Sequence, residues 1–363
     1  MLYSILIFFL ITISCERNEQ FKDPFYVPDY VYKEAQITWQ RYRNWAQEDE
    51  VCLIGMVTDL HGYWNDRYKQ LSYLAATDSI FNWNCLMFLG DTSLDLVTNY
   101  EEGIALLNEY SIYLSRYDGI YGYTIGNHDV KRLEDKSITN EIVAAAFMPL
   151  SQREKYNIDF NDKYCFGSFD LDNPNMRVLL VNSLDNKGEL SLRFGYSSTQ
   201  LLYIIDKLTS LSEGQCVAIF SHSINNIIGG WASSPRAPQN NSNGSIYENI
   251  LNDFIAKKSG VNTGYGMKWD FTKVPASCKL VGNMAGHTHF DLQTKTPDGI
   301  NYIVSQGYAD VPASERQPNS VFTSFNSNNQ VLFECIAIKP QKGEMKYFRI
   351  GAGGAQRDRT FTF

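Results

Sequence analysis

Apolar residues recur along this chain in short runs of strand length, separated by segments with helical spacing. The apolar runs are residues 51–58, 85–89, 119–125, 177–181, 216–220, 278–281 and 302–305. Segments with apolar residues at helical spacing lie between several of them, at 68–76, 101–113, 200–211 and 246–257. Such runs are typical of buried strands, and their alternation with helices predicts a layered α/β protein.

The two ends of the chain add further elements. Residues 331–339 and 345–350 alternate as a β-hairpin does, and a glycine-rich stretch follows them. Residues 15–48 are polar and rich in aromatic residues, and we expect them to form a tether or an edge segment with a helix over 30–45. No internal repeat or linker divides the rest, so the pattern predicts one domain over 49–363.

Length and charge limit the classes of function. A chain of 363 residues, 44% of them hydrophobic, can bury a large core. The formal charge of −8 provides no basic footprint for a phosphate backbone, so we expect no nucleic-acid polymer as a partner. Small phosphorylated substrates remain compatible with this charge, because bound cations would offset it locally.

The first fourteen residues are almost entirely apolar. They are shorter than the ~20 residues of a membrane span and predict a secretory signal peptide over 1–14. Cys15 and the polar residues after it resemble the lipobox of bacterial lipoproteins, although no Lys or Arg precedes the apolar run and Thr12 stands where a larger aliphatic is usual. We therefore expect a protein outside the cytoplasm, in the periplasm or at the cell surface, held to the membrane by lipid on Cys15. Simple cleavage of the signal is the alternative.

The other cysteines do not form a CxxC pair. Several lie inside apolar runs, where cysteine behaves as a small hydrophobe. The six are Cys52, Cys85, Cys165, Cys216, Cys278 and Cys335. We expect buried free thiols, with disulfides as the alternative in an oxidising compartment.

Histidine is confined to a few motifs. All 5 histidines fall in the segments Asp59-Leu60-His61, Gly126-Asn127-His128-Asp129, Ser221-His222 and Gly286-His287-Thr288-His289, and Gly90-Asp91 lies between the first two. Imidazoles concentrated beside carboxylates and an amide are suited to binding metal ions.

These motifs also share a place in the predicted fold. Asp59, Asp91, Asn127, His222 and His287 each follow an apolar run, so they would lie beyond the carboxyl ends of strands. Open α/β sheets bind their ligands there. A single histidine or aspartate is more often a packed residue or a helix cap than a ligand, but the joint arrangement favours a metal site.

The order Asp-x-His, Gly-Asp, Gly-Asn-His-Asp, a lone His and Gly-His-x-His resembles the calcineurin-like metallophosphoesterases. The resemblance covers residues 51–310, and the set of motifs is highly specific as a whole. It implies a four-layer αββα sandwich of two mixed sheets flanked by helices. Residues 348–353 and 358–359 resemble the C-terminal strand of some bacterial and phage members, a much weaker cue.

The resemblance also implies a dinuclear centre containing manganese, iron or zinc. One metal would be held by Asp59, His61, Asp91 and His289, and the other by Asp91, Asn127, His222 and His287. It implies hydrolysis of phosphate mono- or diesters by a hydroxide that bridges the metals. His128 would be the general acid, with Asp129 fixing its tautomer.

Two features bear on the substrate. Family members that act on phosphoserine and phosphothreonine carry Gly-Asp-x-Val-Asp-Arg-Gly, whereas this chain lacks that arginine after Asp91, which disfavours protein phosphatase activity. The long Gly/Asn-rich stretch 224–244 follows His222, and loops of such length are uncommon unless functional or disordered. Trp231 and Arg236 within it are the candidate substrate contacts.

The alternative to an enzyme is a catalytically weak, metal-stabilised binding or interaction lipoprotein. The complete ligand set and the retention of His128 favour the enzyme, because a binding protein has no use for a general acid. Hydrolysis of a generic aryl phosphate after manganese loading separates the two. The sequence does not distinguish monoesters from diesters and does not determine the oligomeric state.

Overall fold

The computed structural model describes residues 26–61, 69–92, 94, 97–134, 136–185, 194–225, 243–307 and 331–363. The expected signal peptide, Cys15, Trp231 and Arg236 lie outside these residues. Within them, no helix is long and apolar enough to cross a membrane. The six cysteines that the structure describes are buried and free, as predicted.

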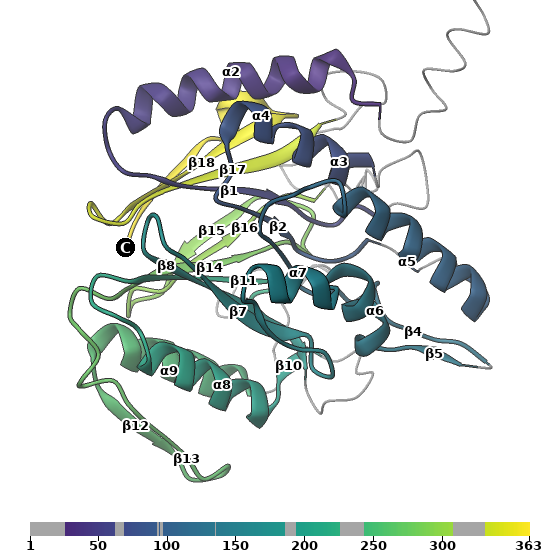
Figure 1. Ribbon diagram of the computed structural model, residues 1–363. Helices are drawn as coiled ribbons and strands as arrows, with labels where there is room; N and C mark the ends of the chain where they lie inside the picture. The colour runs from purple at the N-terminus through teal and green to yellow at the C-terminus, as the bar shows by residue number, and fades with distance from the viewer. Residues whose placement is uncertain are drawn as a thin grey trace, which may run out of the picture.

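One large sheet combines strands from both ends of the described chain (Figure 1). Its six strands lie in the order β19-β18-β17-β1-β2-β3. The strands are β1 (Cys52–Val57), β2 (Cys85–Phe88), β3 (Tyr121–Tyr123), β17 (Leu332–Lys339), β18 (Glu344–Gly351) and β19 (Arg359–Thr362). β1, β2 and β3 are parallel, and the predicted C-terminal hairpin adds β17 antiparallel to β1.

The second large sheet has seven strands in the order β15-β16-β14-β11-β8-β7-β6. They are β6 (Asp159–Asn161), β7 (Phe166–Leu171), β8 (Met176–Val181), β11 (Cys216–Ser221), β14 (Lys279–Ala285), β15 (Leu292–Lys295) and β16 (Asn301–Val304). The central strands β8, β11, β14 and β16 are parallel, and β6, β7 and β15 are antiparallel to their neighbours. Both large sheets are therefore mixed.

Helices cover the outer faces of the two sheets (Figure 1). On the six-stranded sheet these are α2 (Asp29–Ala46), α3 (Lys69–Ala76), α4 (Asp78–Phe81) and α5 (Tyr100–Leu114), and on the seven-stranded sheet α8 (Ser198–Thr209) and α9 (Gly244–Ala256). This arrangement confirms the predicted αββα sandwich. The remaining elements are α6 (Asn140–Phe147), α7 (Leu150–Lys155), the 3-10 helix η3 (Gly354–Arg357), and the small strand pairs β4–β5 (Lys131–Arg132, Ser137–Ile138), β9–β10 (Leu184–Asp185, Gly195–Tyr196) and β12–β13 (Ser259–Asn262, Met267–Asp270).

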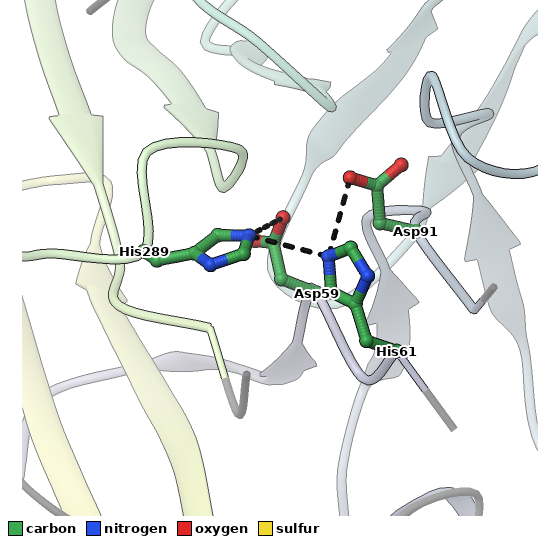
Figure 2. A group of neighbouring side chains, drawn as sticks. All are labelled: Asp59, His61, Asp91 and His289. Carbon is green, nitrogen blue, oxygen red and sulfur yellow. Dashed lines mark hydrogen bonds and ion pairs between the residues drawn. The ribbon is translucent and has the colours of Figure 1, made fainter. Parts of the chain in front are cut away.

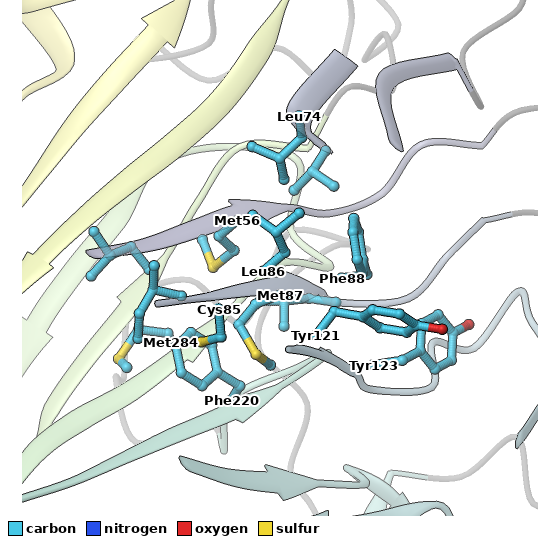
Figure 3. Close-up of a cluster of buried hydrophobic side chains, with 14 of the residues drawn as sticks. Met56, Leu74, Cys85, Leu86, Met87, Phe88, Tyr121, Tyr123, Phe220 and Met284 are labelled. Atoms are coloured by element: carbon cyan, nitrogen blue, oxygen red, sulfur yellow. The ribbon is translucent and has the colours of Figure 1, made fainter. Parts of the chain in front are cut away.

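Alternation along the central strands explains the four layers. In β8, Val178 and Leu180 belong to the larger core cluster, whereas Leu179 and Val181 belong to the cluster that includes buried residues of α8 and α9. Successive side chains of a strand point to opposite faces, so a continuously apolar strand fits between two apolar layers. Figure 3 shows side chains of both sheets in the larger cluster, among them Met56, Met87 and Phe220.

Helix α2 packs on the C-terminal strands. Thr38 Oγ1 donates to the backbone carbonyl of Arg349 in β18 at 3.2 Å, and the Arg41 guanidinium pairs with the carboxylate of Asp358. Val31 and Ala35 on the same helix are fully buried. The helix expected over 30–45 is therefore present and lies against the domain.

The strand predicted over 278–281 is longer in the structure, because β14 continues to Ala285. Its second half contains Gly282 and Asn283, which do not fit an apolar run. Asn283 is fully buried, but its amide accepts from Ser221 Oγ and donates to Tyr247 Oη, both at 3.0 Å. A buried polar side chain with its hydrogen bonds made is compatible with a central strand, and sequence periodicity alone does not reveal those partners.

Candidate metal centre

The histidine-containing motifs meet where the two large sheets face each other at the carboxyl ends of their parallel strands. Asp59 and His61 follow β1, and Asp91 follows β2. Asn127 and His128 follow β3, His222 directly follows β11, and His287 and His289 follow β14. The location agrees with the rule for open α/β sheets.

Hydrogen bonds hold these loops together. His61 donates its backbone N–H to the carbonyl of Asp91 at 2.9 Å, and Gly286 donates to the carbonyl of His222 at 3.0 Å. The backbone N–H of His287 donates to Asp59 Oδ2 at 2.8 Å, which joins the loops of the two sheets. Thr58 Oγ1 also donates to Asp59 Oδ2, at 2.7 Å. The positions of the side chains therefore depend on pairing between distant loops.

Most of the predicted ligands have a left-handed backbone conformation. The positive φ angles are 52° for Asp59, 43° for His61, 51° for Asp91, 70° for His287 and 58° for His289. Non-glycine residues adopt this region rarely, and the cost of about 1–3 kcal/mol per residue is tolerated chiefly at functional sites. The concentration of strained residues in these loops indicates that the loops serve to position the side chains of the predicted ligands.

Two glycines allow the loops to come this close. A Cβ on Gly126 would lie 2.2 Å from Asp91 Oδ1, and one on Gly286 would lie 2.4 Å from Asp59 Oδ2. Any side chain at either position would therefore displace a predicted ligand.

The first group of donor atoms combines two carboxylates and two imidazoles (Figure 2). It consists of Asp59, His61, Asp91 and His289, and its ligand atoms all lie within 4.8 Å of one another. His61 Nε2 and His289 Nε2 are 3.2 Å apart, and His289 Nε2 is 3.3 Å from Asp59 Oδ1. The two imidazole nitrogens face each other, as ligands of one ion do.

The second group shares Asp91 with the first and adds His222 and His287. His222 Nε2 lies 3.2 Å from Asp91 Oδ2, and His61 Nε2 approaches the same oxygen to 3.6 Å. Asn127 Oδ1 is 3.1 Å from His222 Nε2, which places the predicted amide ligand beside this group. The structure thus brings all seven predicted ligands together, with Asp91 between the two groups.

A backbone carbonyl orients His222. Its Nδ1 lies 2.7 Å from the carbonyl oxygen of Leu89, just after β2. When Nδ1 donates to this carbonyl, Nε2 is the ring nitrogen that faces Asp91 and is placed to bind a metal ion. Metal-binding histidines are commonly oriented in this way.

The buried carboxylates of the centre are stable in their charged form only with positive charge beside them. Burial alone would lower the pKa of His222, but the carboxylate of Asp91 outweighs burial and raises the pKa to about 10. Burial alone would raise the pKa of Asp91, but the surrounding imidazoles, led by His222, hold it well below its ordinary value. For Asp59 the imidazole of His289 likewise overcomes burial and lowers the pKa to about 2. Carboxylates this deeply buried require a compensating cation.

The environment of His287 indicates that the compensating cation is a metal ion. Its Nε2 is buried without a hydrogen-bond partner, and such orphaned polar atoms are rare. Burial, and then the charge of His222, lower the pKa of His287 to about 3, so the ring is neutral and keeps a free lone pair. A neutral imidazole aimed at a carboxylate centre fits a metal ion better than a proton.

His128 lies at the edge of the centre and belongs to neither donor group. Its side chain is 36% exposed, and its Nε2 is 4.0 Å from Asp91 Oδ2. The His128 ring packs against that of His61, with centroids 4.9 Å apart. It therefore faces both the centre and solvent.

Asp129 is fully buried and accepts hydrogen bonds from several loops. The donors to its carboxylate are the backbone N–H groups of Asp91, Thr92 and Gly126 and the hydroxyls of Thr92 and Tyr123. This pattern assigns Asp129 to fixing the loops after β2 and β3. The prediction that it also sets the tautomer of His128 stays a prediction.

An ion network that periodicity did not indicate supports the His289 loop. The fully buried Arg349 donates to Asp291 Oδ1 and to Glu334 Oε1, each at 2.7 Å. Asp291 also accepts from the backbone N–H of Gln306 at 2.9 Å. A buried charge is stable only when it is paired, so β17 and β18 are tied to the loop that carries His287 and His289. The C-terminal Phe-Arg and Asp-Arg sequences were the only signal of this role.

Comparison with known proteins identifies the fold. No protein family model matches the chain, and no curated protein matches it. Among solved structures, a dimetal phosphatase from Danio rerio is similar, with a TM-score of 0.53 and 15% identity over 87% of this chain and 100% of that chain. A structure of GAP50, the anchor in the inner membrane complex of Plasmodium, has a TM-score of 0.44 and 10% identity over 86% of this chain and 88% of that chain. The first likeness shows that this chain has the fold of a dimetal phosphatase, the calcineurin-like fold expected from the motifs.

Proposed function

We propose that this protein is a dinuclear-metal phosphoesterase that hydrolyses mono- or diesters of small phosphorylated molecules. The observation that carries the proposal is the pair of donor groups that share Asp91, placed at the carboxyl ends of the strands in a dimetal phosphatase fold. Oxygen and imidazole donors without thiolates suit manganese, iron or zinc.

The ligands divide as the motifs imply. Asp59, His61, Asp91 and His289 would hold one ion, and Asp91, Asn127, His222 and His287 the other. Two bound cations supply Lewis-acid stabilisation of phosphoryl oxygens and make a water acidic enough to act as the nucleophile at neutral pH.

The protein's own groups complete the reaction. His128 stands beside the donor groups with part of its ring exposed, where it can hold a proton for the departing oxygen of the ester. Its backbone N–H donates to Asp91 Oδ1 at 2.8 Å, which couples the position of the acid to that of the shared ligand. Asp129 would support both through the loops that it holds.

The proposed function predicts both metal content and activity. After loading with manganese, elemental analysis is expected to approach two transition-metal ions per chain, and the protein is expected to hydrolyse a generic aryl phosphate. Treatment with a chelator should remove the ions and the activity together, and reloading should restore both. A well-folded protein that retains no metal after loading would contradict the proposal.

We also propose that the protein acts outside the cytoplasm and is anchored through Cys15. One acyl chain binds a bilayer only marginally, so durable anchoring needs more than one on the lipidated cysteine. Cys15→Ser is then expected to move the enzyme from the membrane fraction to the soluble fraction without loss of activity. Fractionation and mass spectrometry of the N-terminus test this. A wild-type chain that begins at Met1 would refute the anchor and leave the phosphoesterase proposal standing.

A further inference from the structure

A cavity of about 470 Å³ adjoins the metal centre. Its described lining residues are Leu94, Asn127, His128, Val130, Lys131, Arg132 and Phe194. Asn127 and His128 link it to the centre, since one is a predicted ligand and the other the predicted acid. A ligand in the cavity therefore reaches the site of reaction.

The position of His128 indicates which part of a substrate the cavity holds. The phosphoryl group belongs at the two donor groups, from which His128 is set apart. A general acid must lie within hydrogen-bond reach of the oxygen that leaves. The group attached to that oxygen must then extend past His128, and the cavity is lined by His128.

The walls of the cavity combine apolar surface with positive charge. Phe194 packs on His287, with ring centroids 4.9 Å apart, and Leu94 and Val130 add aliphatic surface. Two cations on β4 also line it. Lys131 Nζ donates to the carbonyl of Leu94 at 2.9 Å, which holds its ammonium group at the wall.

Arg132 is the more available of the two cations. It is exposed, and the structure gives it no hydrogen bond or ion pair with another described residue. None of the described residues that line the cavity has a carboxylate that would neutralise it. A guanidinium presents a planar fork of donors suited to carboxylate and phosphate groups.

We propose that Arg132 and Phe194 form a subsite for the leaving group, and that the preferred substrates are phosphate esters whose leaving group has an apolar or aromatic body and a second anionic group. The inference rests on the proposed function for its orientation. It defines a substrate class that the metal ligands by themselves do not select.

Two matched esters test the subsite. Phenyl phosphate and the phosphate ester of 4-hydroxyphenylacetate have leaving groups of similar acidity, but only the second has a carboxylate. The manganese-loaded protein is expected to prefer the second in kcat/KM by about 10-fold, the effect of one charge-assisted hydrogen bond. Arg132→Gln should remove most of this preference, and Arg132→Lys should retain part of it because the charge remains.

Lys136→Gln provides the control. Lys136 lies on the same β4–β5 hairpin, but its ammonium stacks on the Tyr100 ring at 4.8 Å and does not line the cavity. This variant removes the same unit of charge and is expected to keep the preference. Phe194→Leu should lower kcat/KM for both aryl esters relative to that for methyl phosphate. Its metal content should be unchanged, which elemental analysis checks.

A binding measurement separates failure of the subsite from failure of the proposed function. Calorimetry with benzylphosphonate and its 4-carboxymethyl derivative, which are not hydrolysed, should show about 10-fold tighter binding of the carboxylate and loss of that difference in Arg132→Gln. If neither ester is hydrolysed but this binding pattern is observed, the subsite proposal is supported and the phosphoesterase proposal is contradicted. Equal binding and equal hydrolysis of the paired compounds, or a preference that Arg132→Gln retains, would overturn the subsite and leave the phosphoesterase intact.

Discussion

Asp91→Asn is expected to remove most of the metal from both sites and to abolish measurable hydrolysis of phosphate esters. Asp91 is the one residue common to the two donor groups, and its Oδ2 faces both His222 and His61. Loss of an outer partner of a metal ligand costs about 10–100-fold in affinity or activity. Loss of a charged ligand that both ions share should lower the metal affinity of each site by more than that factor. Elemental analysis after manganese loading measures the effect directly.

His289→Ala and Asp170→Asn give the comparison. His289 belongs to one donor group only, so its loss should leave close to one ion per chain. Asp170 is an exposed carboxylate on β7 that pairs with Arg177, far from the centre in the fold, and its amide variant should keep both ions. Two ions bound to folded Asp91→Asn would show that Asp91 does not bridge the sites.

His128→Gln is expected to lower turnover of alkyl phosphates by about 10²–10⁴-fold, the usual contribution of a general acid. Its metal content should stay near that of the wild type, because His128 lies outside both donor groups. Glutamine is preferred to alanine because it fills much of the space of the ring and can still form hydrogen bonds, but it has no proton to transfer at neutral pH.

The leaving group separates a proton donor from a merely structural residue. Nitrophenolate departs without protonation, so nitrophenyl phosphate should lose much less activity in His128→Gln than an alkyl phosphate. The ratio of the two losses is the measurement. Equal losses for both esters would mean that His128 acts on binding or on the geometry of the centre and not as the acid.

Local pattern predicted much of the secondary structure. Buried strands such as β1 and β2 are continuous apolar runs, and α5 begins at a position that the sequence marks well. Asn99 caps it by accepting from the backbone N–H of Glu102, while the Glu102 carboxylate accepts from that of Thr98. These are short-range signals. Strand β12 has no comparable signal, because it alternates between exposed and partly buried residues and has no apolar face.

The partners of each predicted residue required the tertiary structure. Asp129 follows His128 in the chain, and adjacency suggested that one orients the other. The structure adds that its carboxylate accepts hydrogen bonds from backbone N–H groups in the loops after β2 and β3, which the sequence did not indicate. Phe194 gave no signal at all, because its importance comes from contact with His287, which is far away in sequence. Asp291 likewise gave no signal, because its role depends on the contact with Arg349 of β18, which is distant in the chain.

The sequence by itself determined the α/β class, the order of most elements and the identity of the residues gathered at the centre, because apolar periodicity and the spacing of histidines and carboxylates are local properties. Only the tertiary structure decided that β17 pairs with β1, that Arg349 supports the loop of His289 and that a cationic cavity lies beyond His128. These depend on contacts between segments distant in the chain. Their geometry follows from how two twisted sheets pack, which no short stretch of residues specifies.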